Sequence, residues 1–441
     1  MPSYTSSWDW ALSSEGERFL DAEEVGGSSP PAPTTVSPGL SRRPSGAGDA
    51  SRDGSSPAGP PTPPLSLQVR LYETAESLDH LAGPWDALVE QAAASIFHTS
   101  TWVRAWWEAF GHGRSWHVLG VWAGDRLVGL APFCRERTRS GARRLRTLGS
   151  PEADYGGVVV APDVVGPVSR LLAETLYEDR AWDVVWMPEV PQEATASHRL
   201  LTHFRERGMR VLVRESCTCR VSLPASWSEY LSVLSPPTRR RLLQKARRLE
   251  ELGARVVRCE SPSDPSTGVE TFVRLHTEQW TQKGRGSLLL NSRQIRFHTL
   301  LTAALAKQNR LDLCWLQVGG SVHAAVYDFR FGKSVYSYLS AVNLRHLQRL
   351  SPGILLTLWR IRAAIEDGYS WYDLLRGQEP YKATLGASPY PTYTYQVVHP
   401  KRWRAWWYLA LGPLRERMLR KEAAARPGAP GAELGPVEDG V

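Results

Sequence analysis

The sequence lacks the features that would place it in a membrane or outside the cell. No stretch among its 441 residues approaches the roughly 18 consecutive apolar residues of a membrane-spanning helix. The first twenty residues hold neither a basic start nor an apolar run, so we expect no secretory signal. We therefore expect a cytoplasmic protein, and peripheral contact with the inner membrane stays open.

Cysteine is scarce and irregularly placed. The five cysteines fit neither a disulfide framework nor the C-x-x-C spacing of a zinc site. We expect buried thiols, reducing surroundings and no metal. The cysteines are Cys134, Cys217, Cys219, Cys259 and Cys314.

Positive charge is concentrated in two segments of a chain whose net charge is +8. Residues 235–258 hold eight Arg or Lys and two Glu, and residues 401–421 hold seven Arg or Lys and one Glu. Such local patches argue against a protein that is basic all over in order to coat nucleic acid.

The first 64 residues differ in composition from the rest. They contain 11 Pro, 13 Ser and 8 Gly. Such a stretch cannot bury enough apolar surface to offset its ordering entropy. We expect residues 1–64 to be disordered.

The remaining chain holds an internal repeat. Residues 121–131 and 316–326, which are 195 positions apart, both have the pattern of strand, tight glycine turn and strand. Residues 178–185 and 366–375 both look like a helix end followed by a strand. This order predicts two copies of one α/β unit. The predicted divisions are 65–215 for the first copy, 216–398 for the second, and 399–441 for a basic aromatic helix and a disordered tail.

The second copy has the clearer pattern. Ser351 suits a helix N-cap, Pro352 suits the first helical position and Gly368 suits a left-handed end, so we predict a helix between them. The other predicted helices are 269–283, 292–308 and 379–385, and the predicted strands are 311–317, 322–331, 333–341, 371–375 and 393–399.

The turn that enters this helix is the first candidate site. A helix N-terminus presents unpaired N–H groups and partial positive charge, which suit a diphosphate. Residues 348–354, with Ser351 at the first glycine position, resemble the GNAT acetyltransferase fingerprint Gln/Arg-x-x-Gly-x-Gly/Ala. An ordinary capped helix would explain the same residues. The resemblance implies that acetyl-CoA, or another acyl-CoA, is held by Gln348, Arg349, Ser351, Gly353 and Ile354.

A second motif lies in residues 372–386. It resembles the Asp-Phe-x-x-Gly-x-x-x-Tyr-Lys signature of BioF2-like, CelD-type acetyltransferases, which are distant relatives of FemAB transferases. The resemblance covers most of residues 68–398. It implies tandem GNAT-like domains, each a mixed sheet flanked by helices, with the first domain degenerate. The motif carries over as Asp373, Gly377, Glu379, Tyr381 and Lys382.

Acyl transfer to an amine requires a base and a proton donor. The amine attacks a thioester only when it is neutral, so a carboxylate must take its proton. Glu379 is our first choice for this base and Asp373 the second, while Tyr381 or Tyr338 could donate to the departing thiolate. In the alternative interpretation, Asp373 caps a turn and Lys382 pairs with Glu379.

Substrate contacts are predicted in both halves. Lys382 suits an acidic group on a ligand. The pair Asp154 and Tyr155 would face a cleft between the halves. The CelD-type resemblance also implies substrate contacts for Trp280 and His298. The alternative for His298 is a hydrogen-bonded histidine of the core.

The two basic segments have open interpretations. Residues 238–252 predict a helix that is capped by Thr238, closes near Gly253 and buries Leu252. Its basic face could bind phosphates of CoA, an anionic saccharide or nucleic acid, or could be a solvated face lying against the other domain. Residues 402–421 form a basic aromatic amphipath that could rest weakly on an anionic membrane or pack on the second domain.

Together these patterns predict an acyl-CoA-dependent N-acyltransferase of the GNAT type. The expected acceptor is an amine or hydroxyl of a saccharide or cell-envelope precursor, and the CelD-type resemblance implies cellulose or exopolysaccharide biosynthesis. FemAB-like aminoacyl transfer from charged tRNA, contacted by residues 235–258, is one alternative. A non-catalytic polysaccharide or membrane-surface accessory protein is the other. Saturable acyl-CoA binding would separate them.

Overall fold

The structure is a computed structural model that describes residues 66–138, 140–258, 265–283, 287, 289, 291–345 and 347–410. The Pro/Ser/Gly-rich segment expected at 1–64 and the tail from residue 411 lie outside the described residues.

The first half alternates helices with strands in the predicted manner. Its main elements are β1 (Leu67–Tyr72), α2 (Leu78–Gln91), α3 (Ser100–Phe110), β2 (Ser115–Ala123), β3 (Arg126–Arg137), β4 (Arg143–Thr147), β5 (Val159–Val160), α4 (Val165–Glu178), β6 (Val184–Pro191), α5 (Thr195–Glu206) and β7 (Arg210–Ser222). Short 3-10 helices are η2 (Ala75–Ser77), η3 (Ile96–His98) and η4 (Pro162–Val164).

The second half repeats this order after two added helices. Its elements are α6 (Trp227–Val233), α7 (Pro236–Glu251), β8 (Arg255–Arg258), α8 (Pro265–Gln282), α9 (Ser292–Lys307), β9 (Leu311–Val318), β10 (Ser321–Phe331), β11 (Ser334–Val342), η6 (Gln348–Leu350), α10 (Pro352–Glu366), β12 (Trp371–Arg376), α11 (Pro380–Thr384), β13 (Ser388–Val398) and α12 (Trp403–Ala410). The second-half helices and strands predicted from the sequence all form, with shifts of a few residues at their ends.

One continuous mixed sheet joins the two halves. In the first half, β1, β2, β3 and β4 pair antiparallel, and β6 then joins β4 in parallel. In the second half, β8, β9, β10 and β11 pair antiparallel, and β12 then joins β11 in parallel. The identical pairing confirms the tandem architecture predicted from the repeat.

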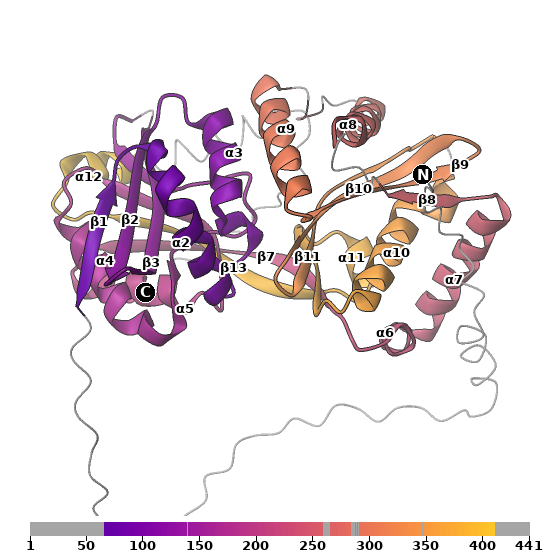
Figure 1. The fold of residues 1–441 in the computed structure, drawn as a ribbon, viewed down its shortest axis with the longest axis horizontal. Helices are drawn as coiled ribbons and strands as arrows, with labels where there is room; N and C mark the ends of the chain where they lie inside the picture. Colours follow the sequence, from indigo (N-terminus) through magenta and orange to yellow (C-terminus); the bar gives the residue numbers. More distant parts are fainter. Residues whose placement is uncertain are drawn as a thin grey trace, which may run out of the picture.

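The two halves exchange strands at the centre of the sheet. β7 of the first half pairs with β12 of the second, and β13 of the second half pairs with β6 of the first. β7 and β13 also pair with each other along their length, and Figure 1 shows β13 spanning both halves. The predicted boundary between residues 215 and 216 therefore falls inside β7, and each half completes its sheet with a strand of the other.

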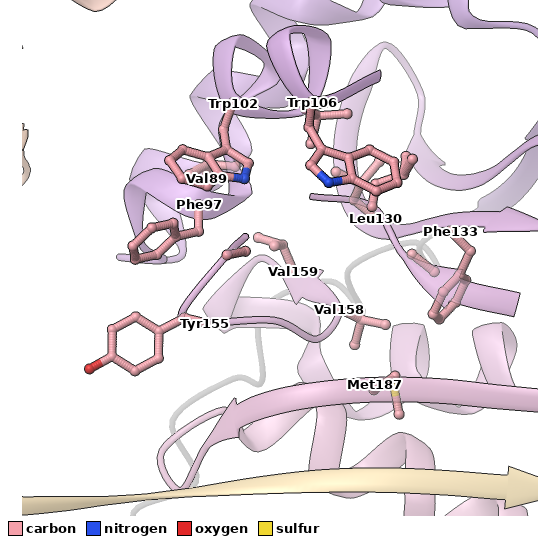
Figure 2. Close-up of a cluster of buried hydrophobic side chains, with 14 of the residues drawn as sticks. Val89, Phe97, Trp102, Trp106, Leu130, Phe133, Tyr155, Val158, Val159 and Met187 are labelled. Carbon is pink, nitrogen blue, oxygen red and sulfur yellow. The ribbon is translucent and has the colours of Figure 1, made fainter. Parts of the chain in front are cut away.

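The corresponding helices α3 and α9 pack against each other where the halves meet. Trp102 of α3 is fully buried, with its ring centroid 5.2 Å from that of Phe297 in α9 and 5.4 Å from that of Tyr338 in β11. Figure 2 shows Trp102 and Trp106 directed from one helix toward the buried cluster around Val159. Aromatic packing thus joins the first half to the helices and strands of the second.

Helix α10 is pinned to the sheet by a buried charge cluster. Arg360 lies 2.6 Å from Asp312 and 3.2 Å from Asp328, and the Tyr372 hydroxyl donates to Asp328 at 2.7 Å. Asp312, Asp328 and Arg360 are buried, and burial raises the pKa of Asp328. Because a lone buried charge is costly, this cluster fixes α10 against β9, β10 and β12.

The basic helix begins earlier than its sequence suggests. Helix α7 starts at Pro236, and Thr238 lies inside it with its hydroxyl 2.9 Å from that of Ser235, so the predicted cap was wrong. Proline prefers the first helical turn, which explains the earlier start. Leu252 is 50% exposed rather than buried. Gly253 follows the helix with φ of 72°, as its predicted terminal role requires.

Within the described ranges, no helix is long and apolar enough to cross a membrane. In the same ranges, His, Cys, Asp and Glu side chains form no group of three that could hold a metal ion.

Candidate functional site

The site is built around the place where β11 and β12 stop pairing. The two parallel strands pair at Ser334–Trp371, Val335–Tyr372 and Tyr336–Asp373, and no further. Beyond these positions β11 continues to Val342 and β12 to Arg376. The peptide groups along the inner edges of both strands are thereby released from the ladder.

The N-terminus of α10 lies at the end of β11. Ser351 precedes the helix in the left-handed conformation (φ 53°, ψ 57°), and its side chain makes no capping hydrogen bond, unlike the predicted N-cap. The first amides of α10 therefore have no side-chain cap. A Cβ atom at Gly353 would come within 2.6 Å of Val342, so glycine permits the close approach of this turn to β11.

Helix α7 supplies a cation to this turn. Lys245 Nζ donates to Ser351 Oγ at 2.8 Å, and burial, followed by repulsion from Arg241, lowers the pKa of Lys245. Gln348 and Arg349 lie exposed in η6 just before the turn. The basic helix thus packs beside the α10 turn of its own half rather than against the other half, and Arg240, Arg241 and Arg248 on it are exposed to solvent.

Helix α8 borders the outer end of β11. Gln279 Oε1 accepts a hydrogen bond from the Val342 amide at 3.2 Å, and Gln282 Oε1 accepts one from the Leu344 amide at 3.1 Å. These bonds fix α8 to the strand that leads into the α10 turn.

Lys382 holds the end of β12 in place. It is 3% exposed, and its Nζ donates to the carbonyl oxygens of Leu375 at 3.2 Å, Arg376 at 2.6 Å and Gly377 at 3.0 Å. All three ammonium donors are thereby engaged. This differs from the prediction that Lys382 meets an acidic group of a ligand, because the strand end itself occupies the ammonium group.

Glu379 lies next to this lysine and remains partly open to solvent. It precedes α11, its Oε2 lies 3.0 Å from Lys382 Nζ, and its side chain is 44% exposed. The predicted pair three residues apart is therefore present. Gly377 has φ of 99°, and a Cβ there would lie 2.6 Å from the Glu379 carboxylate. Glycine at 377 lets this carboxylate fold back against the end of β12.

Asp373 is buried and hydrogen-bonded on both oxygens. The Tyr155 hydroxyl donates to Oδ2 at 2.7 Å, the Leu375 amide donates to Oδ1 at 2.9 Å, and Arg220 Nε lies 3.4 Å from Oδ2. Burial raises the pKa of Asp373 to about 6, although these partners oppose the shift. Asp373 therefore does cap the backbone two residues on, as the alternative interpretation holds, and it also joins the two halves.

A second carboxylate makes the same kind of link. Asp154 bonds Arg376 at the end of β12, and Arg376 also donates to the Pro151 carbonyl at 2.9 Å. Burial raises the pKa of Asp154, and Arg376 opposes the shift. Asp154 and Tyr155, which are predicted to face a cleft between the halves, thus have their polar groups bound to protein partners in the second half.

The corresponding opening in the first half is occupied by the chain itself. β4 and β6 also pair at only three positions, and the loop that follows β4 crosses the gap. The Gly156 amide donates to the Glu189 carbonyl at 3.0 Å, and the Val158 amide donates to Ser197 Oγ at 3.0 Å. Figure 2 shows the Tyr155 hydroxyl pointing away from the core cluster, toward its partners in the other half.

The two tyrosines proposed as donors differ in their surroundings. The Tyr338 hydroxyl donates to the Glu152 carbonyl at 3.1 Å, whereas the Tyr381 hydroxyl makes no hydrogen bond to any described residue. Burial raises the pKa of both side chains, and Glu379 adds to the shift at Tyr381. The two hydroxyls thus differ in availability: that of Tyr338 is engaged by the first half, and that of Tyr381 is not engaged by the described residues.

Trp280 and His298 lie in a separate cluster beneath α8 and α9. Trp280 donates to His276 at 2.8 Å, and burial lowers the pKa of His298 to about 3. His298 and Tyr327 border a small apolar cavity, and the His298 ring lies 6.0 Å from that of Tyr338. Tyr338 therefore connects this cluster to Glu152 of the first half. His298 itself is a core histidine whose Nδ1 has no partner among the described residues.

The cations that hold these groups together have no distinct signal in the sequence. Lys245 lies within the basic helix and Arg376 within the second motif, and neither differs there from its neighbours in a way that predicts a contact. Arg220 lies on β7, with its guanidinium 3.0 Å from the ring centroid of Tyr390. The sequence around Arg220 predicts a strand but not the ion pair, because the partner Asp373 is 153 positions away.

The family comparison concerns the second half. Residues 237–383 match the family model described as acetyltransferase (GNAT) domain. This range includes α7, the α10 turn, Asp373, Glu379 and Lys382. No curated protein sequence matches this chain.

Solved structures share the fold across both halves. The structure of FemX is 12% identical, covers 74% of this chain and 96% of its own, and superposes with a TM-score of 0.55. L-PGS from Bacillus licheniformis is 10% identical with 78% and 97% coverage and a TM-score of 0.48. A tandem GNAT protein from the clavulanic acid biosynthesis pathway is 12% identical with 75% and 98% coverage and a TM-score of 0.41. At 12% identity the likeness to FemX, with its TM-score of 0.55, is one of fold.

Proposed function

We propose that the second half transfers an acyl group from acyl-CoA to an amine or hydroxyl of a saccharide or cell-envelope precursor. The chain has a tandem GNAT-like fold, and its residues 237–383 match the model of an acetyltransferase (GNAT) domain. The transferase type rests on the family match. The donor, the acceptor and the residue roles are our proposal.

The observation that carries the proposal is the uncapped α10 N-terminus beside the unpaired ends of β11 and β12. Ser351 leaves the first α10 amides without a side-chain cap, and Gly353 brings them close to β11. Free amides, the helix dipole and Lys245 together favour a diphosphate. The part of β11 beyond Tyr336, where the strand no longer pairs with β12, offers peptide partners to an amide-containing arm such as pantetheine. Gln348, Arg349 and Ile354 would complete the cofactor contacts.

The proposed chemistry uses Glu379 and Tyr381. Glu379 is partly solvent-exposed and takes the proton of the attacking amine, directly or through water, while the amine nitrogen bonds to the thioester carbonyl carbon. The carbon–sulfur bond then breaks, and the departing thiolate receives the proton of the Tyr381 hydroxyl. Transfer is direct in a ternary complex. Cys219 of β7 lies beside the end of β12, where its thiol donates to the Gly377 carbonyl at 3.4 Å, but burial raises the pKa of this thiol and disfavours the nucleophilic thiolate.

Asp373, Asp154 and Lys382 act in this proposal as positioning residues. Their bonds to Tyr155, Arg376 and the carbonyls of residues 375–377 fix the end of β12, from which the Glu379 carboxylate is placed. Tyr155 thereby serves the site from the first half. Trp280 and His298 reach the proposed acceptor site only indirectly, because the His298 ring of their cluster contacts Tyr338.

Acyl-CoA consumption tests the proposal. Full-length protein is mixed with acetyl-CoA and a panel of amino sugars and nucleotide sugars, and products are followed by mass spectrometry. We expect one acceptor class to gain the mass of an acetyl group as free CoA appears. Absence of saturable acetyl-CoA binding by calorimetry would overturn the donor assignment and favour the accessory-protein alternative.

Aminoacyl transfer from charged tRNA is the second candidate, and one observation favours it. Arg241, Lys245 and Arg248 recur at helical spacing on α7 and extend the positive charge beyond the α10 turn. A nucleic-acid backbone would span such a row, and its binding would weaken steeply with salt. Steep salt dependence with tRNA, together with no binding of acetyl-CoA, would select this candidate.

A further inference from the structure

The short helix α12 displays two large aromatic side chains to solvent. Trp403 and Trp407 are 66% and 59% exposed and lie four residues apart, on one face of the helix. Few other large apolar side chains of the described chain are exposed to this extent. Two exposed tryptophans on one helical face indicate an interaction surface, because contiguous exposed apolar area is uncommon on a protein without such a role.

The opposite face of α12 is firmly packed. Ala405 is fully buried, and Tyr408 is 3% exposed in a cluster with Ala142 and Val184 of the first half. The Tyr408 hydroxyl also donates to Gln396 of β13 at 3.2 Å. Because the inner face is anchored to the sheet, the outward direction of Trp403 and Trp407 is fixed by the fold.

The surroundings of the exposed pair are cationic. Residues 399–410 contain Lys401, Arg402 and Arg404 and no Asp or Glu. The Arg404 guanidinium lies 5.0 Å from the ring centroid of Trp403. Indole rings with neighbouring cations suit the headgroup level of an anionic membrane, where the ring enters the interface and the charge meets lipid phosphate.

The segment that directly follows the helix is unsuited by its charge to cover this face. Residues 411–421 hold four Arg or Lys and one Glu, so they repeat the sign of charge found on α12. A cationic segment is repelled by a cationic face, whereas an anionic lipid surface attracts both.

We propose that the Trp403–Trp407 face of α12, with its flanking cations, docks the protein on an anionic phospholipid surface. This inference is independent of the acyl-transfer chemistry, because α12 lies on the first half and outside residues 237–383. Figure 1 shows α12 at the far end of the molecule from α10.

Vesicle flotation tests this proposal with the full-length chain. We expect it to float with vesicles of phosphatidylcholine containing about 30% phosphatidylglycerol and to stay in solution with phosphatidylcholine alone. The variant Trp403→Ser/Trp407→Ser should lower the partition coefficient about tenfold or more. Arg402→Gln/Arg404→Gln should lower it about fivefold for each charge removed.

Matched controls separate this surface from others. Val233→Ser removes a side chain that is 70% exposed on α6, and Arg240→Gln removes an exposed cation of α7, so neither should change flotation. Flotation that is absent in the parent chain, or that survives the tryptophan variant but is lost with Arg240→Gln, would overturn the proposal. Self-association that the tryptophan variant abolishes, without vesicle binding, would overturn it in favour of a second copy of the chain.

Discussion

The two halves share one strand order, yet they treat the opening between their parallel strands in opposite ways. In the first half, the loop through Tyr155 and Gly156 fills the opening and bonds to Glu189. In the second half, β11 and β12 separate beside the N-terminus of α10, which, like that of α4, has no side-chain cap. The opening is thus filled by the chain in one half and left unpaired in the other.

The first copy contributes most visibly through its displaced loop. Asp154 and Tyr155 follow the strand end and bond Arg376 and Asp373 in the second half. The segment that closes one opening therefore buttresses the other. Strand exchange through β7 and β13 holds the two halves together, since each half needs a strand of the other to complete its part of the sheet.

The largest expected effect tests whether chemistry belongs to the second half. Glu379→Gln removes the proposed base while keeping its size, so turnover should fall about 10²–10⁴-fold with acyl-CoA affinity nearly unchanged. Steady-state kinetics and calorimetry measure the two quantities. Glu366→Gln, an exposed change at the end of α10, is the control. Equal turnover of the Glu379 variant and the parent would remove Glu379 as the base.

The next effect concerns how each half anchors its helix. Helix α10 is held by Arg360 between two buried carboxylates, whereas α4 buries mainly apolar residues such as Leu172. Arg360→Met leaves the buried Asp328 with the Tyr372 hydroxyl but no cation, while Asp312 keeps Arg258 and Arg330. The free energy of unfolding should therefore fall by about 3 kcal/mol in urea titrations. Arg362→Met, which breaks the exposed pair with Glu366, should cost about 1 kcal/mol or less. Similar losses in the two variants would contradict the buried anchor.

A pH measurement tests the link between the halves at Asp373. Its pKa is about 6 in the folded protein and above its ordinary value, so the folded state holds this proton more tightly than the unfolded chain. The stability that this proton contributes is present below pH 4 and is lost as the pH rises through 6. Asp373→Asn should therefore reduce the fall in unfolding free energy across this window by on the order of 3 kcal/mol.

The control for that slope is Asp367→Asn, which changes an exposed residue just after α10. Unfolding free energies at pH 4 and pH 7 give the slope for each variant. Identical slopes in the parent chain and the Asp373 variant would show that this carboxyl does not titrate in the window.

The smallest expected effect concerns the Tyr155 hydroxyl, which binds Asp373 of the second half. Tyr155→Phe keeps the ring and deletes two buried hydrogen bonds of the hydroxyl, to Asp373 and to Thr218, so the unfolding free energy should fall by about 2 kcal/mol. The pKa of Asp373 should rise further, because the lost hydroxyl stabilised the carboxylate. Tyr177→Phe on α4 serves as the comparison. An unchanged Asp373 titration would mean that Tyr155 does not bind this carboxylate in solution.

Local patterns in the sequence predicted much of the second half. Gly319 and Gly320 have positive φ in the β9–β10 turn, where the glycine pair predicted a hairpin, and Gly368 ends α10 with φ of 77°. The spacing of Glu379 and Lys382 also predicted their ion pair. These features depend on neighbours within a few residues, which sequence patterns record.

Features that depend on distant neighbours could not be predicted. The exchange of β7 and β13 joins strands that begin 178 residues apart, and alternation alone does not say which strand lies beside which. Lys382 looked available for a ligand because its three carbonyl partners arise only from the turn after β12. The Lys245–Ser351 contact likewise depends on how α7 packs against the α10 turn.

The most direct test of an acyl-CoA site confined to the second half compares two glycines at the second position of equivalent helices, Gly353 in α10 and Gly166 in α4. Calorimetric titration with acetyl-CoA should give saturable binding to the parent chain, at least about tenfold weaker binding to Gly353→Trp, and parent-like binding to Gly166→Trp. Circular dichroism confirms that both variants fold. Parent-like affinity in a folded Gly353→Trp, or loss of affinity in Gly166→Trp alone, would contradict the assignment of the donor site to the α10 turn.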